Sequence, residues 1–259
     1  MPELGLDGIL LLAVSAFLAG GVDAVVGGGG LIQLPALMLA FPGAAPVQLL
    51  ATNKLGSIAG TSMSSLTYYR RVHPDLRTAA PLAIAAFAGS ALGALVAFDL
   101  PRSAFNPIVL VALIAVGGYI VLKPDLGRIE QLRHTGRRHY GAAAAIGVAI
   151  GFYDGALGPG TGSFLVFALV SWLGYAFLEA SAKARIANFA TNLAALAIFV
   201  PQGAVMWRAG LLIAAANLAG GYVGARIAVA RGARFIRVVF IVVVSAFAVK
   251  LGWDILTAP

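Results

Sequence analysis

Hydrophobic residues in this chain form long runs, separated by short stretches that carry most of the charges. Four of these runs contain no charged residue, and they cover 78–98, 103–122, 155–178 and 186–207. Each run is long enough to cross the roughly 30 Å of hydrocarbon in a bilayer as an α-helix. Buried helices of a large soluble protein would carry polar faces, which these runs lack. The pattern predicts an all-α, polytopic integral membrane protein.

The apolar segments divide into two sets of five. They are predicted at roughly 8–22, 30–41, 47–69, 78–98 and 104–122 in the first set, and 140–153, 162–178, 184–200, 208–229 and 235–253 in the second. We therefore divide the chain into a first transmembrane repeat at 1–122, a polar and basic linker at 123–139, and a second transmembrane repeat at 140–259. The sequence leaves open whether the first two segments of each repeat span the bilayer or re-enter it.

Composition supports this class and narrows the partners. Hydrophobic residues make up 60% of the 259 residues and charged residues 11%, whereas a soluble domain carries about 25% charged residues. The formal net charge is +8, but the basic residues lie in short loops, where lysine and arginine set membrane orientation. We therefore expect a lipid bilayer as the partner, and no nucleic acid. The chain has no cysteine, which excludes disulfides and thiolate metal sites.

The second half of the chain repeats the first at an offset of 131 residues. Both halves contain the pattern G-x-x-D-x-x-x-G-x-G, and the same offset aligns a later G-x-x-x-G pair. The aligned positions are Gly20 with Gly151, Asp23 with Asp154, Gly27 with Gly158, Gly29 with Gly160, Arg77 with Arg208, Gly89 with Gly220, and Gly93 with Gly224. We infer an internal duplication, in which the G-x-x-x-G pairs let helices approach closely.

Loop charges predict that the two repeats are inverted relative to each other. An odd number of segments in each repeat places the second repeat upside down in the membrane. Basic residues are concentrated at 70–77, 123–139 and 230–234, whereas 201–208, the counterpart of 70–77, holds one. Because cytoplasmic loops carry the excess of lysine and arginine, we expect the three basic loops in the cytoplasm and both termini outside.

A glycine-rich break interrupts the apolar sequence in each repeat. The N–H groups in the first turn of the helix that follows lack partners and carry the positive end of the helix dipole. Two such helix N-termini facing each other would bind an anion, and glycine lets the ligand approach closely. Interrupted helices in inverted repeats are found in many secondary transporters, which bind substrate near the bilayer midplane. The predicted site includes Gly27, Gly28, Gly29 and Gly30 of the first break and Gly158, Gly160, Thr161 and Gly162 of the second.

Two lysines are candidates for neutralising the substrate. Lys54 is the only charged residue in 24–69, and it lies roughly 12 Å into its segment at 1.5 Å per residue. Lys183 is its expected counterpart in the second repeat. A charge inside a span costs at least about 2.5 kcal/mol and usually faces a functional cavity. In the alternative, Lys54 snorkels or pairs with Asp23, and Lys183 and Arg185 mark the cytoplasmic end of a span.

Uncharged polar and acidic residues accompany these lysines. Side chains that could hydrogen-bond at a similar depth are Thr52, Asn53, Asn188, Thr191 and Asn192. They either bind the substrate or link neighbouring helices. Asp23 and Asp154 are the only acids well inside the predicted spans. Because a bare carboxylate would repel an anion, each either holds its break in shape or carries a proton that is coupled to transport.

The stretches AGGVDAVVGGGGLIQLPAL, ATNKLGS and GFYDGALGPGTGSF resemble the TauE/SafE family of sulfite exporters, most closely its bacterial membrane-transporter branch. The resemblance covers almost the whole chain. It implies a multi-pass protein of the bacterial inner membrane that moves small anions such as sulfite, sulfoacetate or related sulfonates. The matching motif positions are Gly27, Gly28, Gly29, Gly30, Pro35, Thr52, Asn53, Lys54, Gly158, Pro159, Gly160 and Gly162. Pro159 and Thr161 interrupt the second glycine motif, so the two breaks differ in sequence.

These features predict a secondary transporter that moves small anions by alternating access, with both glycine breaks and Lys54 at its site. An anion channel would share most of the features, and a membrane-embedded enzyme is a weaker alternative. His73, His134 and His139 fall in predicted loops, so no intramembrane histidine is expected for metal binding or acid–base chemistry. The glycines match neither dinucleotide nor P-loop signatures. We expect no cofactor and no metal, and leave open proton coupling and the oligomeric state.

Overall fold

The computed structural model describes residues 5–99 and 129–256. All regular secondary structure in these residues is helical, which confirms the predicted all-α class. The helices are α1 (Leu6–Val26), α2 (Gly30–Ala40), α3 (Pro46–Val72), α4 (Leu76–Val96), α6 (Gly136–Ala156), α7 (Thr161–Ala168), the π-helix η1 (Leu169–Leu173), α8 (Phe177–Phe199) and α9 (Trp207–Leu256). The segment predicted at 104–122 lies outside the described residues.

Several helices extend beyond the predicted apolar segments. α1 continues through Asp23 and α6 through Asp154, so both acids lie near the C-terminal ends of their helices. α6 also begins at Gly136, inside the stretch predicted to be the linker. α8 begins at Phe177, soon after the left-handed turn at Gly174 (φ 86°), and not near 184 as predicted. The charged residues in the first half of α8 are therefore helical.

The uncharged run at 155–178 is not one spanning helix, contrary to the length argument from sequence. Left-handed backbone at Gly158 (φ 90°) and Gly160 (φ 80°) interrupts it, and residues 161–173 form α7 and η1. α2 is similarly short, with 11 residues. At 1.5 Å per residue it is about 16 Å long, roughly half of the hydrocarbon thickness. Both glycine breaks are therefore followed by half-length helices.

The exterior of the bundle is apolar and the interior contains polar and charged groups. Two of the described helices, α1 and α4, are long and apolar enough to cross a membrane, with mean hydropathies of 2.3 and 1.9. Large apolar side chains face outward, among them Ile84 at 72% and Leu211 at 61% exposure. α3 and α8 instead bury charged side chains. This distribution is consistent with a helical membrane protein, in which charges face the bundle interior.

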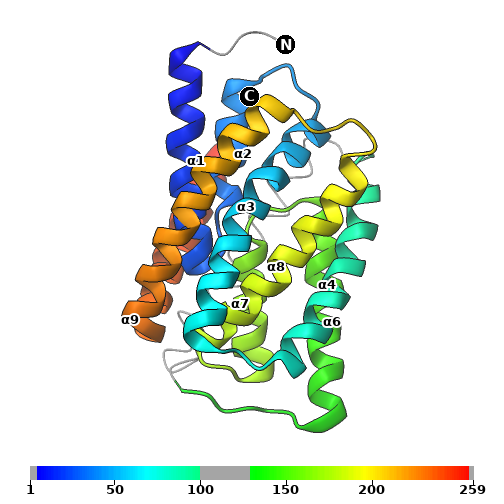
Figure 1. Ribbon diagram of the computed structural model, residues 1–259, viewed down its shortest axis with the longest axis vertical. Coiled ribbons are helices and arrows are strands. Elements are labelled where there is room, and N and C mark those ends of the chain that lie inside the picture. The colour runs from blue at the N-terminus through cyan, green and yellow to red at the C-terminus, as the bar shows by residue number, and fades with distance from the viewer. Residues whose placement is uncertain (1–4, 100–128, 257–259) are drawn as a thin grey trace.

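α3 and α8 lie at the centre of the bundle, and the other long helices pack around them (Figure 1). α1 packs against α9, and α6 packs against α4. α3 also contacts α9, and α8 also contacts α4. In Figure 1, α1 and α3 run downward along the chain, whereas α6 and α8 run upward.

Glycines let these helix pairs approach backbone to backbone, as the G-x-x-x-G pattern predicts. A Cβ on Gly220 of α9 would overlap the carbonyl of Phe17 in α1. A Cβ on Gly89 of α4 would overlap the carbonyl of Val148 in α6. Both residues of the second contact lie 131 positions from their counterparts in the first. The same relation holds one turn further along, for Gly224 with Gly21 and Gly93 with Phe152.

α9 contains an interruption at Gly232. This residue has φ 73° and ψ −169°, which is not helical. The interruption lies between the two segments predicted at 208–229 and 235–253, so the sequence pattern located the division of α9.

Candidate functional site

The two glycine breaks both contain a left-handed glycine at equivalent positions, but they differ further along, because Gly160 has φ 80° whereas its counterpart Gly29 has φ −56°. Gly27 follows the end of α1 and Gly158 follows the end of α6, and both have φ 90°. Glycine adopts this left-handed conformation without the steric cost that other residues incur. α2 begins at Gly30 and α7 at Thr161, three residues after these glycines. Each break therefore leads directly into the N-terminus of a half-length helix.

The first break is pressed against the start of α7. The N–H of Ser163 donates to the carbonyl of Gly27 at 3.2 Å, and its hydroxyl donates to the carbonyl of Val26 at 2.8 Å. A Cβ on Gly27 would overlap the backbone of Gly162. The contact is therefore one of backbone against backbone, with hydrogen bonds that close it.

The second break approaches the start of α2 less closely, since a Cβ on Gly30 would lie 3.4 Å from Cα of Pro159. Ile32 is the counterpart of Ser163, and its N–H donates to Gly29 in its own break. A Cβ on Gly158 would lie 3.2 Å from Cδ1 of Leu50 and 3.4 Å from Nζ of Lys54. Side chains of α3 therefore occupy the place that backbone occupies at the first break.

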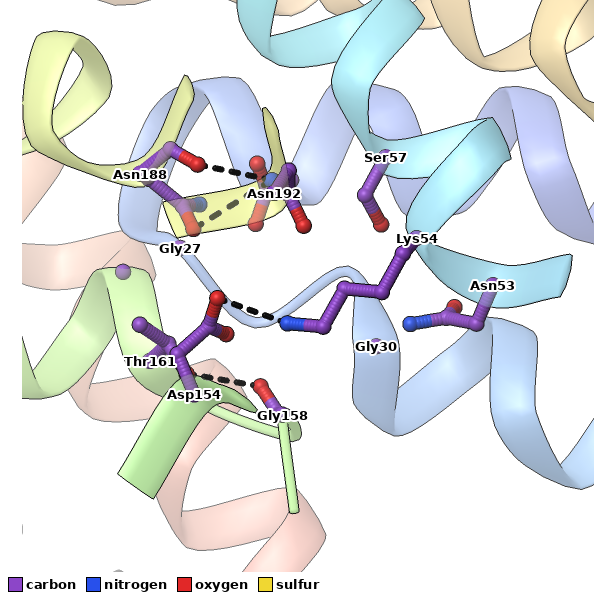
Figure 2. Close-up of a pocket in the computed structure, with 12 residues that line it drawn as sticks. Gly27, Gly30, Asn53, Lys54, Ser57, Asp154, Gly158, Thr161, Asn188 and Asn192 are labelled. Atoms are coloured by element: carbon purple, nitrogen blue, oxygen red, sulfur yellow. Dashed lines mark hydrogen bonds and ion pairs between the residues drawn. The ribbon is translucent and has the colours of Figure 1, made fainter. Parts of the chain in front are cut away.

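Lys54 of α3 and Asp154 of α6 form an ion pair inside the protein (Figure 2). Nζ of Lys54 lies 2.6 Å from Oδ2 of Asp154, and both side chains are 2% exposed. The attraction within such a pair offsets part of the cost of removing both charges from water. The alternative pairing considered from sequence, Lys54 with Asp23, is not the one observed.

A second ion pair joins Arg185 of α8 to Asp23 of α1. Nη1 of Arg185 lies 3.5 Å from Oδ2 of Asp23 and also donates to the main-chain carbonyl of Asp23. Arg185 is fully buried. The offset of 131 relates Lys54 to Arg185 as well as Asp23 to Asp154, so the two ion pairs are equivalent. The expected counterpart of Lys54, Lys183, is therefore wrong by two residues.

Lys183 contributes to a different group of side chains. Its Nζ lies 2.9 Å from Oε2 of Glu179 and 4.3 Å from the centroid of the Tyr175 ring. The hydroxyl of Tyr175 lies 2.8 Å from Nε2 of His139 and 3.2 Å from Oγ1 of Thr78. We call these five residues the end cluster, because they join the start of α4 to α6 and α8.

The prediction that all three histidines lie in loops is wrong for His139. This residue lies in the first turn of α6, which begins at Gly136, and it is 5% exposed. Its side chain belongs to the end cluster. Among the residues that the structure describes, no group of three His, Cys, Asp or Glu side chains is placed to hold a metal ion.

Both breaks and the Lys54–Asp154 pair border a small pocket (Figure 2). Its empty space, which includes open solvent at the mouth, is about 250 Å³. The lining residues are Asp23, Gly27, Gly30, Asn53, Lys54, Ser57, Asp154, Gly158, Thr161, Gly162, Asn188 and Asn192. The offset of 131 relates four pairs among them, Asp23 with Asp154, Gly27 with Gly158, Gly30 with Thr161, and Ser57 with Asn188. The pocket therefore lies where equivalent parts of the two halves meet.

Most residues of the predicted site line this pocket. Five lie outside the lining, namely Gly28, Gly29, Thr52, Gly160 and Lys183. The hydroxyl of Thr52 accepts the N–H of Met206 at 3.0 Å, which links α3 to the residue that precedes α9. The N–H of Gly29 lies 3.4 Å from Oδ1 of Asp23, so this acid helps to hold the first break in shape. Gly160, with φ 80°, precedes the first turn of α7.

Uncharged polar side chains complete the pocket. Ser57 was missed by the sequence argument, although it follows Lys54 by three residues and therefore shares its helix face. Nδ2 of Asn192 donates to the main-chain carbonyl of Asn188 at 2.8 Å. Oδ1 of Asn53 is buried with no hydrogen-bond partner among the described residues. A small anion in the pocket could form an ion pair with Lys54 and accept hydrogen bonds from these side chains.

The fold is all-helical and has an apolar exterior, and a charged pocket lies where the two glycine breaks meet. These are the features of a polytopic membrane protein with an internal ligand site. The sequence matches the family described as "Sulfite exporter TauE/SafE" over residues 12–251. The chain belongs to this family. No solved structure matches the chain.

Curated relatives extend over nearly the whole chain. The "Probable membrane transporter protein ORF9" of Sinorhizobium sp is 38% identical over 251 residues, which are 97% of this chain and 95% of the relative. A "Probable membrane transporter protein" of Haemophilus influenzae is 32% identical over 97% of both chains. The "Probable membrane transporter protein YfcA" of Escherichia coli strain K12 is 34% identical over 95% of this chain and 91% of the relative.

Proposed function

We propose that the chain is a secondary transporter that moves small anions, either sulfite or other organosulfur and organic anions, across a bacterial inner membrane. The observation that carries the proposal is the ammonium group of Lys54, buried in a pocket that both glycine breaks border. A buried charge of this kind in a membrane protein marks a substrate or ion pathway. Membership of the sulfite exporter family and the printed names of the relatives support transport.

Two inverted repeats, 1–122 and 140–259, joined by the linker at 123–139, would account for the arrangement. At the offset of 131, α1 corresponds to α6, α3 to α8, and α4 to the first part of α9. α1 and α6 run in opposite directions, as do α3 and α8. The contact of α1 with α9 corresponds to that of α6 with α4. These observations support inverted repeats, in which the substrate binds near the midplane.

The orientation of the repeats can be tested separately. We expect the loops at 70–77, 123–139 and 230–234 in the cytoplasm and both termini outside, because of the excess of basic residues in those loops. The chain has no cysteine, so single cysteines can be labelled. Arg71→Cys should react with an impermeant maleimide only after cells are opened, and Gly5→Cys should react in intact cells. Labelling of Arg71→Cys in intact cells would reject the orientation.

Anion binding in this pocket requires the displacement of a carboxylate. Asp154 lies 2.6 Å from Nζ of Lys54 and would repel an anion at that position. In our proposal the anion replaces Asp154 at Lys54, while the hydroxyl of Thr161 and the amide of Asn188 donate hydrogen bonds to it. Asp154 takes up a proton as it leaves Lys54. The anion and the proton therefore bind together, which couples transport to the proton gradient.

The contact at the first break favours a carrier over an anion channel. Ser163 closes this break with hydrogen bonds to Val26 and Gly27, so one side of the pocket is sealed by backbone. A carrier seals one side of its site at a time, whereas a conducting channel needs a continuous path. We expect anion flux that saturates and responds to a pH gradient. Ohmic single-channel currents would favour the channel.

The test is a binding and flux screen of the purified protein with sulfite, thiosulfate, sulfoacetate, taurine and carboxylates. Lys54→Gln should weaken binding of the preferred anion by roughly 10- to 150-fold, because losing one charge-assisted hydrogen bond costs about 1.5–3 kcal/mol. Lys183→Gln is the matched control, since it makes the same change outside the pocket, and should alter affinity by less than about threefold. Unchanged affinity in a folded Lys54→Gln protein would contradict the proposed site. A wild-type protein that binds no member of the panel would contradict the substrate class.

A further inference from the structure

Arg185 is the largest of the fully buried side chains in the described residues. Asp23 pairs with only some of its N–H donors. Nη1 contacts Asp23, but Nε and Nη2 are buried with no hydrogen-bond partner among the residues that the structure describes. A guanidinium has five N–H donors, and leaving a buried donor unpaired is unfavourable, more so when it is charged. A residue that served only to neutralise Asp23 would not need these additional donors.

Arg185 lies directly behind one wall of the pocket. The backbone of Gly27 and Gly162, which both line the pocket, forms this wall. A Cβ on Gly162 would lie 3.0 Å from Nη1 of Arg185 and would also overlap Gly27. The hydrogen bonds of Ser163 hold the wall closed. Glycine backbone therefore separates Arg185 from the space that Lys54 borders.

The repeat makes Arg185 the counterpart of Lys54. The offset of 131 joins these two residues, and it also joins Asn188 to Ser57, three residues further along each helix. Asn188 and Ser57 both line the pocket, but of the two cations only Lys54 does. When two inverted repeats exchange their conformations, a site that opens to one side of the membrane becomes a site that opens to the other. Such an exchange would open the wall at Gly27 and Gly162 and bring Arg185 into the pocket.

We propose that Arg185 is a second anion-binding residue, which takes over the anion from Lys54 when the carrier changes to its opposite-facing state. This inference rests on the proposed function. The state described here is the resting state, in which Lys54 faces the pocket. In the other state the free N–H donors of Arg185 bind the oxygen atoms of the anion, as planar guanidinium groups do. Asp23 then leaves Arg185, as Asp154 leaves Lys54 in the state described here. The anion is therefore bound by a cation in both the inward-facing and the outward-facing state.

Binding and translocation can be separated with sulfite as the probe. Arg185→Gln in detergent should bind sulfite within about threefold of the wild type, because the resting state uses Lys54. Sulfite counterflow in proteoliposomes should fall by at least about tenfold, because the opposite-facing state loses charge-assisted hydrogen bonds. Lys54→Gln is the comparison variant, and it should lose binding as well as counterflow. A loss of binding in Arg185→Gln as large as that in Lys54→Gln would overturn the inference.

A double variant distinguishes an anion-binding residue from a structural charge. Asp23→Asn with Arg185→Gln leaves no unpaired charge behind the wall, so it also carries the test if the single variant fails to fold. If Arg185 only neutralises Asp23, the double variant should recover counterflow to within about threefold of the wild type, and this result would overturn the inference. We expect counterflow to stay at least about tenfold below the wild type. A wild-type protein that binds no anion in the screen would instead overturn the proposed function.

Discussion

The first and second glycine breaks both begin with a left-handed glycine, but the surroundings of that glycine differ. Gly27 and Gly158 both have φ 90°, but the first meets the backbone of α7 and the second meets side chains of α3. The ion pairs differ in the same way, because Lys54 borders the pocket whereas Arg185 lies behind its wall. The duplicated sequence thus supplies two copies of a glycine break with an ion pair. In the conformation described here, only one of the two cations borders the pocket.

Alanine at each break should reveal the largest difference. At both positions a side chain would be strained by the left-handed backbone conformation. At Gly27 it would also overlap the backbone of Gly162, whereas at Gly158 there is no overlap with backbone as close as this. The left-handed conformation costs about 1–2 kcal/mol and overpacking about 1–3 kcal/mol. We expect Gly27→Ala to destabilise by about 2–5 kcal/mol and Gly158→Ala by about 1–2 kcal/mol. Thermal unfolding in detergent would measure this, and equal losses would show that the contact at Gly27 is not tight.

Asparagine at each acid should give smaller effects, and they should again differ between the two breaks. Asp154 contacts Lys54, where the proposed mechanism places the anion, whereas Asp23 contacts Arg185 and the N–H of Gly29. Asp154→Asn should therefore tighten anion binding by roughly tenfold, since about 1.4 kcal/mol of competition is removed. Uptake driven by a pH gradient should be lost, while counterflow continues.

Asp23→Asn is the matched control for this pair. It removes the same charge from the equivalent position, but it leaves the Lys54–Asp154 pair intact. We expect anion affinity within about threefold of the wild type. If Asp154→Asn keeps gradient-driven uptake, Asp154 is not the proton carrier. If the two variants behave alike, the two acids are equivalent in function as well as in sequence.

The breaks and Lys54 could be predicted from sequence because their signals are local. A run of glycines in apolar sequence and a lone charge between 24 and 69 need no knowledge of packing. The starts of α6 and α8 could not be predicted, because both helices continue into charged sequence. In α8 the packing buries Lys183 and Arg185, which the sequence pattern does not show. The choice of Lys183 over Arg185 was wrong for a related reason. Residues that are two positions apart in a helix lie about 200° apart around its axis. A misalignment of two residues therefore selects the opposite face of the helix.

The smallest difference lies at the start of two equivalent helices. Asp75 precedes α4 and accepts the N–H of Arg77 and the hydroxyl of Thr78, each at 3.0 Å. Its counterpart before α9 is Met206, which has no side chain of this kind. Desolvation tends to raise the pKa of the Asp75 carboxyl, but the hydrogen bonds from Arg77 and Thr78 outweigh it. The pKa therefore lies below its ordinary value of 3.8.

A lowered pKa means that Asp75 stabilises the folded protein above the ordinary carboxyl pKa, and that this contribution is lost as the pH falls through the lowered value. We expect Asp75→Ala to destabilise the protein by about 1 kcal/mol at neutral pH, as the loss of a helix cap typically does. The difference from the wild type should shrink below about pH 4. Asp75→Asn can still accept the N–H of Arg77 but does not titrate, so its stability relative to Asp75→Ala should not depend on pH. The stability difference between the wild type and Asp75→Ala could instead be as large in acid as at neutral pH. That result would show that the charge of Asp75 contributes nothing to stability. The start of α4 would then resemble the start of α9 more closely than the hydrogen bonds indicate.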